Sequence, residues 1–345
     1  MNKNKPTWFL ILIIPFLFLF CSGHGLQEHV YQGGTMGTSY SIKIVTTAGQ
    51  ALDDSLMHQS IDSLLLAVNM KMSTYIDSSE LSRFNQYRNT DWFPVSPALA
   101  GVFQHALLMS EKSDGAFDIT VAPLVNLWGF GPEHRPVMIP TDQEIAQRLL
   151  RVGYQQIQVD TTQPALRKLH PSIICDLSAI AKGYGVDEVA DYIESKGYDN
   201  YLVEIGGEIR ATGHNRLGNK WRIGIASPNT DPGYVKVISV ENVGVATSGD
   251  YENYFERDGV RYSHTIDPRT GRPITHKLAS VTVVHPSCQI ADAYATAIDV
   301  LGPEKGYEFA LKEELLVFMI IRNNEGFVEK MTPGFEQLIS VLSKR

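Results

Sequence analysis

Asp292 and Thr296 stand four residues apart in a segment of helical character, Ala291-Asp292-Ala293-Tyr294-Ala295-Thr296. Residues at positions i and i+4 share one face of an α-helix. A carboxylate and a hydroxyl on one face can offer two hard oxygens to one small cation, and magnesium prefers such oxygen ligands. The alternative is structural: Asp292 caps its helix, and the Thr296 hydroxyl bonds back to the helix backbone.

Residues 176–184 join an expected strand, 173–177, to an expected helix, 182–195, through small residues and Lys182. The N–H groups at a helix N-terminus, together with a lysine, suit the binding of phosphate. The alternative for Lys182 is a solvated surface position. A hard-cation site beside a phosphate cradle indicates chemistry on a nucleotide pyrophosphate.

His264 precedes the turn at Asp267-Pro268. Histidine titrates near neutral pH, which suits a general base for an attacking hydroxyl. The alternative is a structural histidine that hydrogen-bonds across the turn. The sequence contains no Ser-His-Asp nucleophile elbow and no G-x-G-x-x-G motif, so neither covalent catalysis nor a dinucleotide fold is indicated.

The elements that must position these residues follow from apolar spacing and from capping signals. Apolar residues near a 3.6-residue period predict a helix over 52–72. Ser96-Pro97 predicts the start of a helix that ends near 113–115. Thr141 and Glu144 have the pattern of a capping box and predict a helix over 141–150.

Alternating and apolar runs predict the strands of the fold. They lie at 38–45, 201–205, 221–226, 235–240, 243–247, 260–265, 278–284, 315–321 and 327–331, and a further helix is expected over 289–301. Helices and strands mix without a strict βαβ rhythm. The prediction is therefore an α+β fold, a single compact domain of mixed sheets with packed helices, or one domain with two lobes.

The N-terminus has the features of an export signal. Lys3 and Lys5 precede an apolar run, 8–20, that is short for a membrane span, and Cys21 follows it directly. Cys21 resembles the modified cysteine of bacterial lipoproteins, although residues 18–20 depart from the usual lipobox. We expect a signal peptide at 1–20, lipidated Cys21 and a tether at 21–33, and one domain at 34–345. A plain cleaved signal and an uncleaved anchor are the alternatives.

The remaining composition excludes some functions. The formal charge of −8 disfavours binding to a nucleic-acid backbone. Only Cys175 and Cys288 follow Cys21, and both stand in apolar surroundings. We expect two separate buried thiols, with one disulfide as the alternative.

Several segments in a fixed order resemble the ApbE family of FAD:protein FMN transferases. They are Met36-Gly37-Thr38, Met72-Ser73-Thr74-Tyr75 with Ser82-Arg83-Phe84-Asn85, residues 114–118 running into 123–131, residues 176–184, Glu204-Ile205-Gly206-Gly207-Glu208, residues 263–271 and residues 292–296. Members of this family attach FMN through a phosphoester bond to a threonine or serine of a target protein. The resemblance covers most of the chain after the N-terminal segment.

The resemblance implies a reaction and a set of site residues. A target hydroxyl attacks the FMN-side phosphorus of FAD, and AMP leaves. Mg²⁺ is held by Asp292, Thr296 and a backbone carbonyl, which we assign to Ala179. The implied contacts to FAD are Met36, Ser73, Thr74, Tyr75, Asp118, Lys182 and His264, and His264 is also the implied base. Phe117 and Trp128 are candidate walls of the flavin site, and the alternative for Asp118 is a buried carboxylate that holds the Thr120 loop.

The implied setting is the cell envelope, with the protein lipid-anchored to the cytoplasmic membrane and facing the periplasm. Its partners would be exported proteins with an acceptor threonine or serine, such as flavin-bearing subunits of membrane redox complexes. Two other functions stay open: a magnesium-dependent FAD pyrophosphatase that gives FMN and AMP, and a non-catalytic FAD-binding lipoprotein.

Overall fold

The computed structural model describes residues 25–131, 139–228, 233–249, 254–257 and 260–339. The expected signal peptide at 1–20 and the expected lipidation site Cys21 lie outside these residues. In the part of the chain that the structure describes, no helix combines the length and the apolar character needed to cross a membrane. Cys175 and Cys288 are buried and unbridged, as predicted.

An eight-stranded antiparallel sheet forms the centre of the molecule, in the order β1-β2-β6-β7-β10-β15-β16-β17. Its strands are β1 (Gln27–Thr35), β2 (Thr38–Thr46), β6 (Tyr201–Ile205), β7 (Glu208–Thr212), β10 (Val243–Gly249), β15 (Leu278–His285), β16 (Leu316–Asn323) and β17 (Gly326–Met331). Sequence neighbours pair as hairpins at β1–β2, β6–β7 and β16–β17. Strand β10 instead pairs with β7 and β15 through longer connections.

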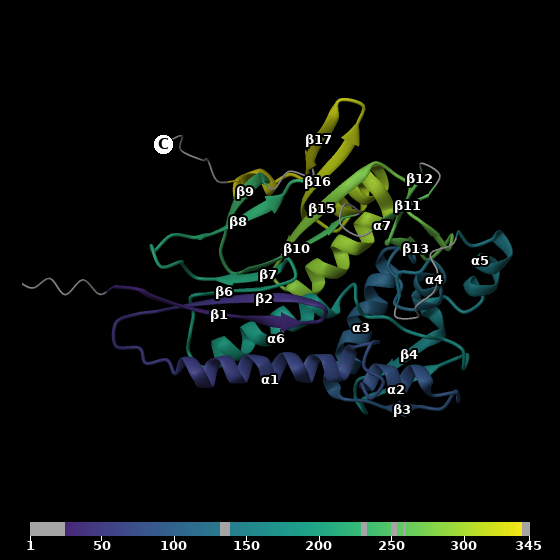
Figure 1. Ribbon diagram of the computed structural model, residues 1–345, viewed down its shortest axis with the longest axis horizontal. Helices are drawn as coiled ribbons and strands as arrows, with labels where there is room; N and C mark the ends of the chain where they lie inside the picture. The colour runs from purple at the N-terminus through teal and green to yellow at the C-terminus, as the bar shows by residue number, and fades with distance from the viewer. Residues whose placement is uncertain (1–24, 132–138, 229–232, 250–253, 258–259, 340–345) are drawn as a thin grey trace, which may run out of the picture.

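Helices α1 (Asp54–Met72), α6 (Ala181–Ser195) and α7 (Cys288–Lys312) cover one face of the large sheet (Figure 1). The apolar stripe of α1 packs with α6 and with the inward side chains of β2 and β6, among them Ile61, Val189 and Ile42. Removing these side chains from water is the main favourable contribution to folding. Helix α7 is bent at Gly302, where φ is 80° and Pro303 follows, so the helix predicted over 289–301 matches its first part.

A second, smaller layer covers part of the opposite face. It is the antiparallel pair β8 (Trp221–Ala226) and β9 (Tyr234–Val240). Trp221 and Ile238 of this pair are buried with Val245 and Phe318 of the large sheet. The sheet is therefore buried on both faces, with helices on one side and a two-stranded layer on the other.

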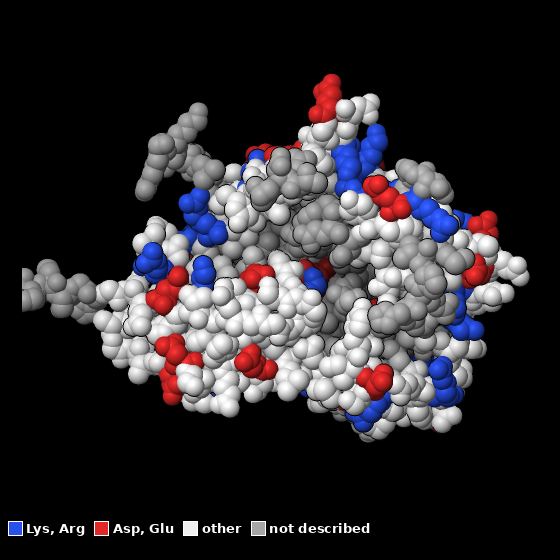
Figure 2. All heavy atoms as spheres, viewed as in Figure 1, with Lys and Arg blue, Asp and Glu red and all other residues white. Residues whose placement is uncertain are grey.

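Short elements complete the chain beside this core. They are α2 (Glu80–Gln86), α3 (Pro97–Lys112), α4 (Ala122–Leu127), α5 (Asp142–Leu149), β3 (Phe93–Pro94), β4 (Ile157–Asp160), β5 (Ala165–Lys168), β11 (Tyr254–Arg257), β12 (Val260–Ser263), β13 (Ile266–Asp267), β14 (Arg272–Pro273), and the 3₁₀ turns η1 (Tyr154–Gln156) and η2 (Phe335–Leu338). The predicted caps are present: Ser96 caps α3, and Thr141 with Glu144 forms a capping box on α5. On the face viewed in Figure 2, lysine and arginine are interspersed with aspartate and glutamate.

The α+β prediction is confirmed, but two local predictions were wrong. The strand expected over 173–177 is absent, because the Asn85 side chain satisfies both backbone groups of Cys175. Its Oδ1 accepts the Cys175 N–H and its Nδ2 donates to the Cys175 carbonyl, each at 2.8 Å. A distant side chain thus takes the place of a strand partner.

The second correction concerns the tether expected over 21–33. Most of it, from Gln27 onward, belongs to β1, which pairs with β2 along its whole length. Gly33 and Gly34 interrupt the alternation of polar and apolar residues by which a strand is predicted from the sequence. A Cβ at Gly33 would lie 2.6 Å from the ring of Tyr40, so glycine is needed where this strand crosses the buried tyrosine.

Candidate active site

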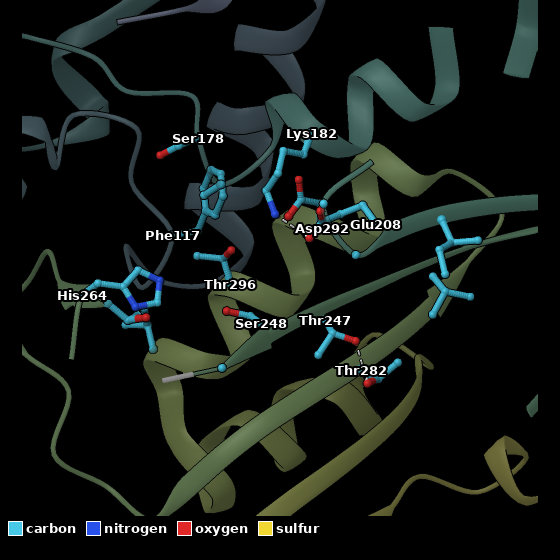
Figure 3. Close-up of a pocket in the computed structure, with 18 of the residues that line it drawn as sticks. Phe117, Ser178, Lys182, Glu208, Thr247, Ser248, His264, Thr282, Asp292 and Thr296 are labelled. Carbon is cyan, nitrogen blue, oxygen red and sulfur yellow. Dashed lines mark hydrogen bonds and ion pairs between the residues drawn. The ribbon is translucent and has the colours of Figure 1, made fainter. Parts of the chain in front are cut away.

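A pocket of about 1000 Å³ lies where the ends of β6, β7 and β10 meet helices α6 and α7. Seven of the residues predicted for the site line it: Tyr75, Asp118, Ala179, Lys182, His264, Asp292 and Thr296. In the view of Figure 3, Lys182, Glu208 and Asp292 converge at one end, and Thr296 lies between them and His264. The structure therefore brings together groups that lie more than a hundred residues apart in the sequence.

Asp292, one of the cation ligands predicted on α7, contacts the N-terminus of α6. One Asp292 oxygen accepts the backbone N–H of Gly183 at 3.0 Å. The two helices can approach this closely because residue 183 is glycine: a Cβ there would lie 2.5 Å from the Cys288 carbonyl oxygen. Asp292 is not the cap of its own helix, since Ser287 holds that position. The structural alternative for Asp292 is therefore not observed.

Three oxygens around this junction lack a hydrogen-bond partner among the described residues: the second Asp292 oxygen, the Thr296 hydroxyl and the Ala179 carbonyl. Thr296 does not bond back to its helix. The N–H of Gly183 goes to Asp292 instead of to Ala179, four residues before it. These are hard oxygens beside a pocket, and their chemistry fits magnesium, which commonly takes one carboxylate and completes its shell with phosphate and water.

No cluster of three or more His, Cys, Asp or Glu side chains with the geometry of a metal site is found in the described residues. The proposed ligand set is not a cluster of that kind, because it contains one carboxylate, one hydroxyl and one backbone carbonyl. Burial raises the pKa of Asp292, and Lys182 and the Gly183 N–H oppose that rise. A nearby positive charge, such as that of a metal cation, would stabilise the ionised form of this buried carboxylate.

Lys182 is not a solvated surface lysine, because its ammonium pairs with Glu208 at 2.7 Å. Burial alone would lower the pKa of Lys182, but the charges of Glu208 and Asp292 outweigh it and raise that pKa. Burial and the charge of Asp292 raise the pKa of Glu208 to about 8, against the opposing effect of Lys182. Glu208 was not among the predicted site residues, although it ends the segment 204–208 that carries part of the family resemblance and directly follows the Gly206-Gly207 turn.

His264 stands at the edge of an aromatic stack. Phe130 contacts the His264 ring edge-to-face at a centroid distance of 6.3 Å, and Phe130, Phe255, Tyr262 and Trp128 stack in turn. Trp128 itself is buried, and its indole N–H donates to the Gly271 carbonyl at 2.8 Å. Trp128 is therefore part of a buried cluster, whereas Phe117 lines the pocket, and its contact with flavin stays a prediction.

Some predicted FAD contacts lie elsewhere in this structure. Met36, Ser73 and Thr74 are not among the residues that line the pocket. The Ser73 hydroxyl accepts the Tyr75 N–H at 3.1 Å, and the Tyr75 side chain is 73% exposed. Contacts from this segment to FAD stay a prediction.

Asp118 is buried, and its carboxylate makes the contacts of the structural alternative. One oxygen accepts the N–H and the hydroxyl of Thr120, at 2.7 and 2.6 Å, and the other accepts the Tyr154 N–H at 2.8 Å. Burial raises the pKa of Asp118, and these hydrogen bonds oppose that rise. Asp118 also lines the pocket, so a ligand bound there could reach it, and its contact with FAD stays a prediction.

Comparison with known proteins identifies relatives of the whole chain. The family model described as "ApbE family" matches residues 36–319. A protein named FAD:protein FMN transferase from Vibrio cholerae is 46% identical over 335 residues, which cover 97% of this chain and 99% of the relative. The protein of the same name from Escherichia coli K12 is 40% identical and covers 92% of this chain and 90% of the relative.

Solved structures agree with the sequence comparisons. The flavin transferase ApbE from Vibrio cholerae superposes with a TM-score of 0.84 at 45% identity, covering 91% of this chain and 99% of that one. The apo form of the Pseudomonas stutzeri flavinyl transferase ApbE gives a TM-score of 0.84 at 38% identity, covering 92% of this chain and 98% of that one. On both grounds, the chain belongs to the ApbE family.

Proposed function

We propose that this enzyme transfers FMN from FAD to a threonine or serine hydroxyl of a target protein, in a magnesium-dependent reaction that releases AMP. The observation that carries the proposal is a set of oxygens in one pocket beside Lys182 and His264: the second Asp292 oxygen, the Thr296 hydroxyl and the Ala179 carbonyl, which have no hydrogen-bond partner among the described residues. The names of the relatives support the transfer of flavin to protein. Pure binding of FAD would not require this combination of groups.

Asp292, Thr296 and the Ala179 carbonyl would hold the magnesium ion. When bound, the ion neutralises charge on the diphosphate and orients it. Lys182 adds a positive charge at the N-terminus of α6, where backbone N–H groups also favour phosphate. These groups bind the substrate and stabilise the charge that builds as the bond to AMP breaks.

His264 is proposed to act on the acceptor. Its ring would accept the proton of the threonine or serine hydroxyl while that oxygen forms its bond to the FMN-side phosphorus. In the same displacement the bond from that phosphorus to the AMP oxygen breaks, and AMP leaves with the electron pair. Phe130 packs against the His264 ring and limits its orientation.

We further propose that the protein is exported and held by a lipid on Cys21 at the periplasmic face of the cytoplasmic membrane. The order of basic residues, apolar run and cysteine supports this location. Its partners would then be exported proteins, such as flavin-bearing subunits of membrane redox complexes.

The test is an assay with the full chain, FAD, Mg²⁺ and an acceptor domain that bears a threonine. Flavin fluorescence should stay on the acceptor after denaturation, with one AMP released for each flavin attached. EDTA, Asp292→Ala or replacement of the acceptor threonine by valine should abolish the label. Release of AMP and free FMN without a labelled acceptor would favour the pyrophosphatase, and FAD binding without AMP release would favour the binding protein.

A further inference from the structure

Glu208 is a buried acid whose presence needs a reason. Its exposure is 1%, and it is the first residue of β7, directly after the tight turn at Gly206-Gly207. One oxygen accepts the Lys182 ammonium, and the other has no hydrogen-bond partner within the described residues. A buried ion pair with an unsatisfied oxygen is weak evidence for stability, because desolvation offsets much of the attraction. Its position beside the proposed cation site suggests another role.

Lys182 stands between two carboxylates and bonds to only one of them. Its pKa reflects both Glu208 and Asp292, so both charges are close. Yet no ion pair of 4.0 Å or less joins Lys182 to Asp292, whose only hydrogen bond among the residues described comes from Gly183. The Asp292 oxygen that faces the pocket is thereby left without an ammonium partner.

We propose that Glu208 is a positioning residue for the cation site: by holding the Lys182 ammonium, it keeps Lys182 from pairing with Asp292 and so leaves Asp292 available to a divalent cation. Lysine carries a compact charge on a flexible four-carbon stem. Without the Glu208 charge, Asp292 is the neighbouring carboxylate that the Lys182 ammonium already feels. A lysine paired with Asp292 would compete directly with the cation.

This inference rests on the magnesium site of the proposed function, so its test measures cation binding without FAD and without turnover. The probe is Mn²⁺, titrated into the full chain in mild detergent and followed by electron paramagnetic resonance of free Mn²⁺. Glu208→Gln should weaken Mn²⁺ binding about tenfold or more. The double variant that combines Lys182→Met with Glu208→Gln should bind Mn²⁺ with an affinity within about threefold of that of Lys182→Met alone. The effect of Glu208→Gln would then depend on Lys182, as is typical of two residues in contact.

The comparison in Lys182→Met distinguishes a role of Glu208 in holding the Lys182 ammonium from a simple loss of negative charge near the cation. If Glu208 only attracts the cation from a distance, Glu208→Gln will weaken Mn²⁺ binding by the same factor with methionine at 182 as with lysine, and the proposal is overturned. Glu204→Gln is the matched control. Glu204 lines the same pocket on the same hairpin, but its carboxylate accepts the Gly207 N–H at 2.8 Å instead of an ammonium. We expect that variant to change Mn²⁺ affinity by less than about twofold.

Two further outcomes are informative. Wild-type affinity for Mn²⁺ retained in Glu208→Gln would overturn the proposal while leaving the cation site intact. Absence of Mn²⁺ binding in the wild type would instead overturn the magnesium site of the proposed function, and the positioning role with it. Thermal melting of each variant shows whether the fold is retained, and Lys182→Met supplies the background if Glu208→Gln alone is unstable.

Discussion

Helices α6 and α7 each place an aspartate at the N-terminus of the other helix, and the two aspartates differ in the number of hydrogen bonds that they accept. At one end, Asp187 of α6 meets the N-terminus of α7 and accepts from the Ser287 hydroxyl and from the N–H groups of Cys288 and Gln289, at 2.7, 3.1 and 3.0 Å. Arg210 adds an ion pair at 3.3 Å. At the other end, Asp292 of α7 meets the N-terminus of α6 and, among the residues that the structure describes, accepts a hydrogen bond from Gly183 alone.

The comparison shows how one motif can serve two purposes. A carboxylate that is surrounded by donors fastens two helices and has no capacity left for a ligand. A carboxylate with one donor is held in place but keeps an oxygen for a cation. The number of donors, and not the residue type, separates the structural end, at Asp187, from the chemical end, at Asp292.

The largest expected effect comes from removing the Asp292 carboxylate at the chemical end. Asp292→Asn should lower kcat/KM for flavin transfer by about 10³-fold or more, which is about 4 kcal/mol of transition-state stabilisation. The melting temperature should hold or rise, because the raised pKa of Asp292 means that folding disfavours its charged form at neutral pH. Parallel activity and melting measurements check this, and a large fall in melting temperature would contradict the comparison.

Breaking the structural end should give the opposite pattern. Asp187→Ala removes the acceptor for two backbone N–H groups and for Ser287, and we expect a loss of about 2–4 kcal/mol in the free energy of unfolding. Activity measured well below the melting temperature should stay within about fivefold of wild type. Asp191→Ala is the control, because Asp191 pairs with the same Arg210 at 2.7 Å but is exposed, and such pairs contribute less than about 1 kcal/mol.

Separating the two helices should affect both ends at once. In Gly183→Ala the new Cβ would meet the Cys288 carbonyl and the backbone of Gln289, so the helices must move apart at a cost of about 1–3 kcal/mol. Activity should fall with stability, since the Gly183 N–H orients Asp292. Gly101→Ala in α3 is the control: a Cβ there has open space, and the variant should be as stable as wild type or up to about 1 kcal/mol more stable.

The smallest effect concerns pH at the structural end. His285 lies just before the cap of α7, and burial lowers its pKa, although the hydrogen bond to Ser287 and the charge of Asp187 oppose this. Because the folded state holds the neutral form, the stability contributed by His285 is present above its ordinary pKa of about 6.5 and is lost as the pH falls below it. The melting temperature of His285→Gln should therefore fall less than that of wild type between pH 7 and pH 5. Equal losses in the two proteins would show that His285 is not the titrating group.

Local spacing allowed part of the site to be predicted. Asp292 and Thr296 lie on one helix face because helix geometry places residues i and i+4 together whatever surrounds them. The caps at Ser96 and Thr141 were predictable for the same reason, since a cap bonds to N–H groups within the next turn. The family resemblance added residues that have no local signal, and three of these, Tyr75, Asp118 and Ala179, line the pocket.

The amino-acid sequence by itself therefore determined the α+β fold class, the helix that carries Asp292 and Thr296, and membership in a family of flavin transferases. Only the tertiary structure decided which carboxylate each donor meets. The Asn85 side chain hydrogen-bonds Cys175 in place of a strand partner, and Glu208 forms an ion pair with Lys182. The Gly183 N–H donates to Asp292, which lies 109 residues further along the chain. These contacts join residues far apart in the chain, and they depend on how α2, α6, α7, β7 and the segment around Cys175 pack. Hydrophobic periodicity predicts each element but carries no information about which polar groups meet when the elements come together.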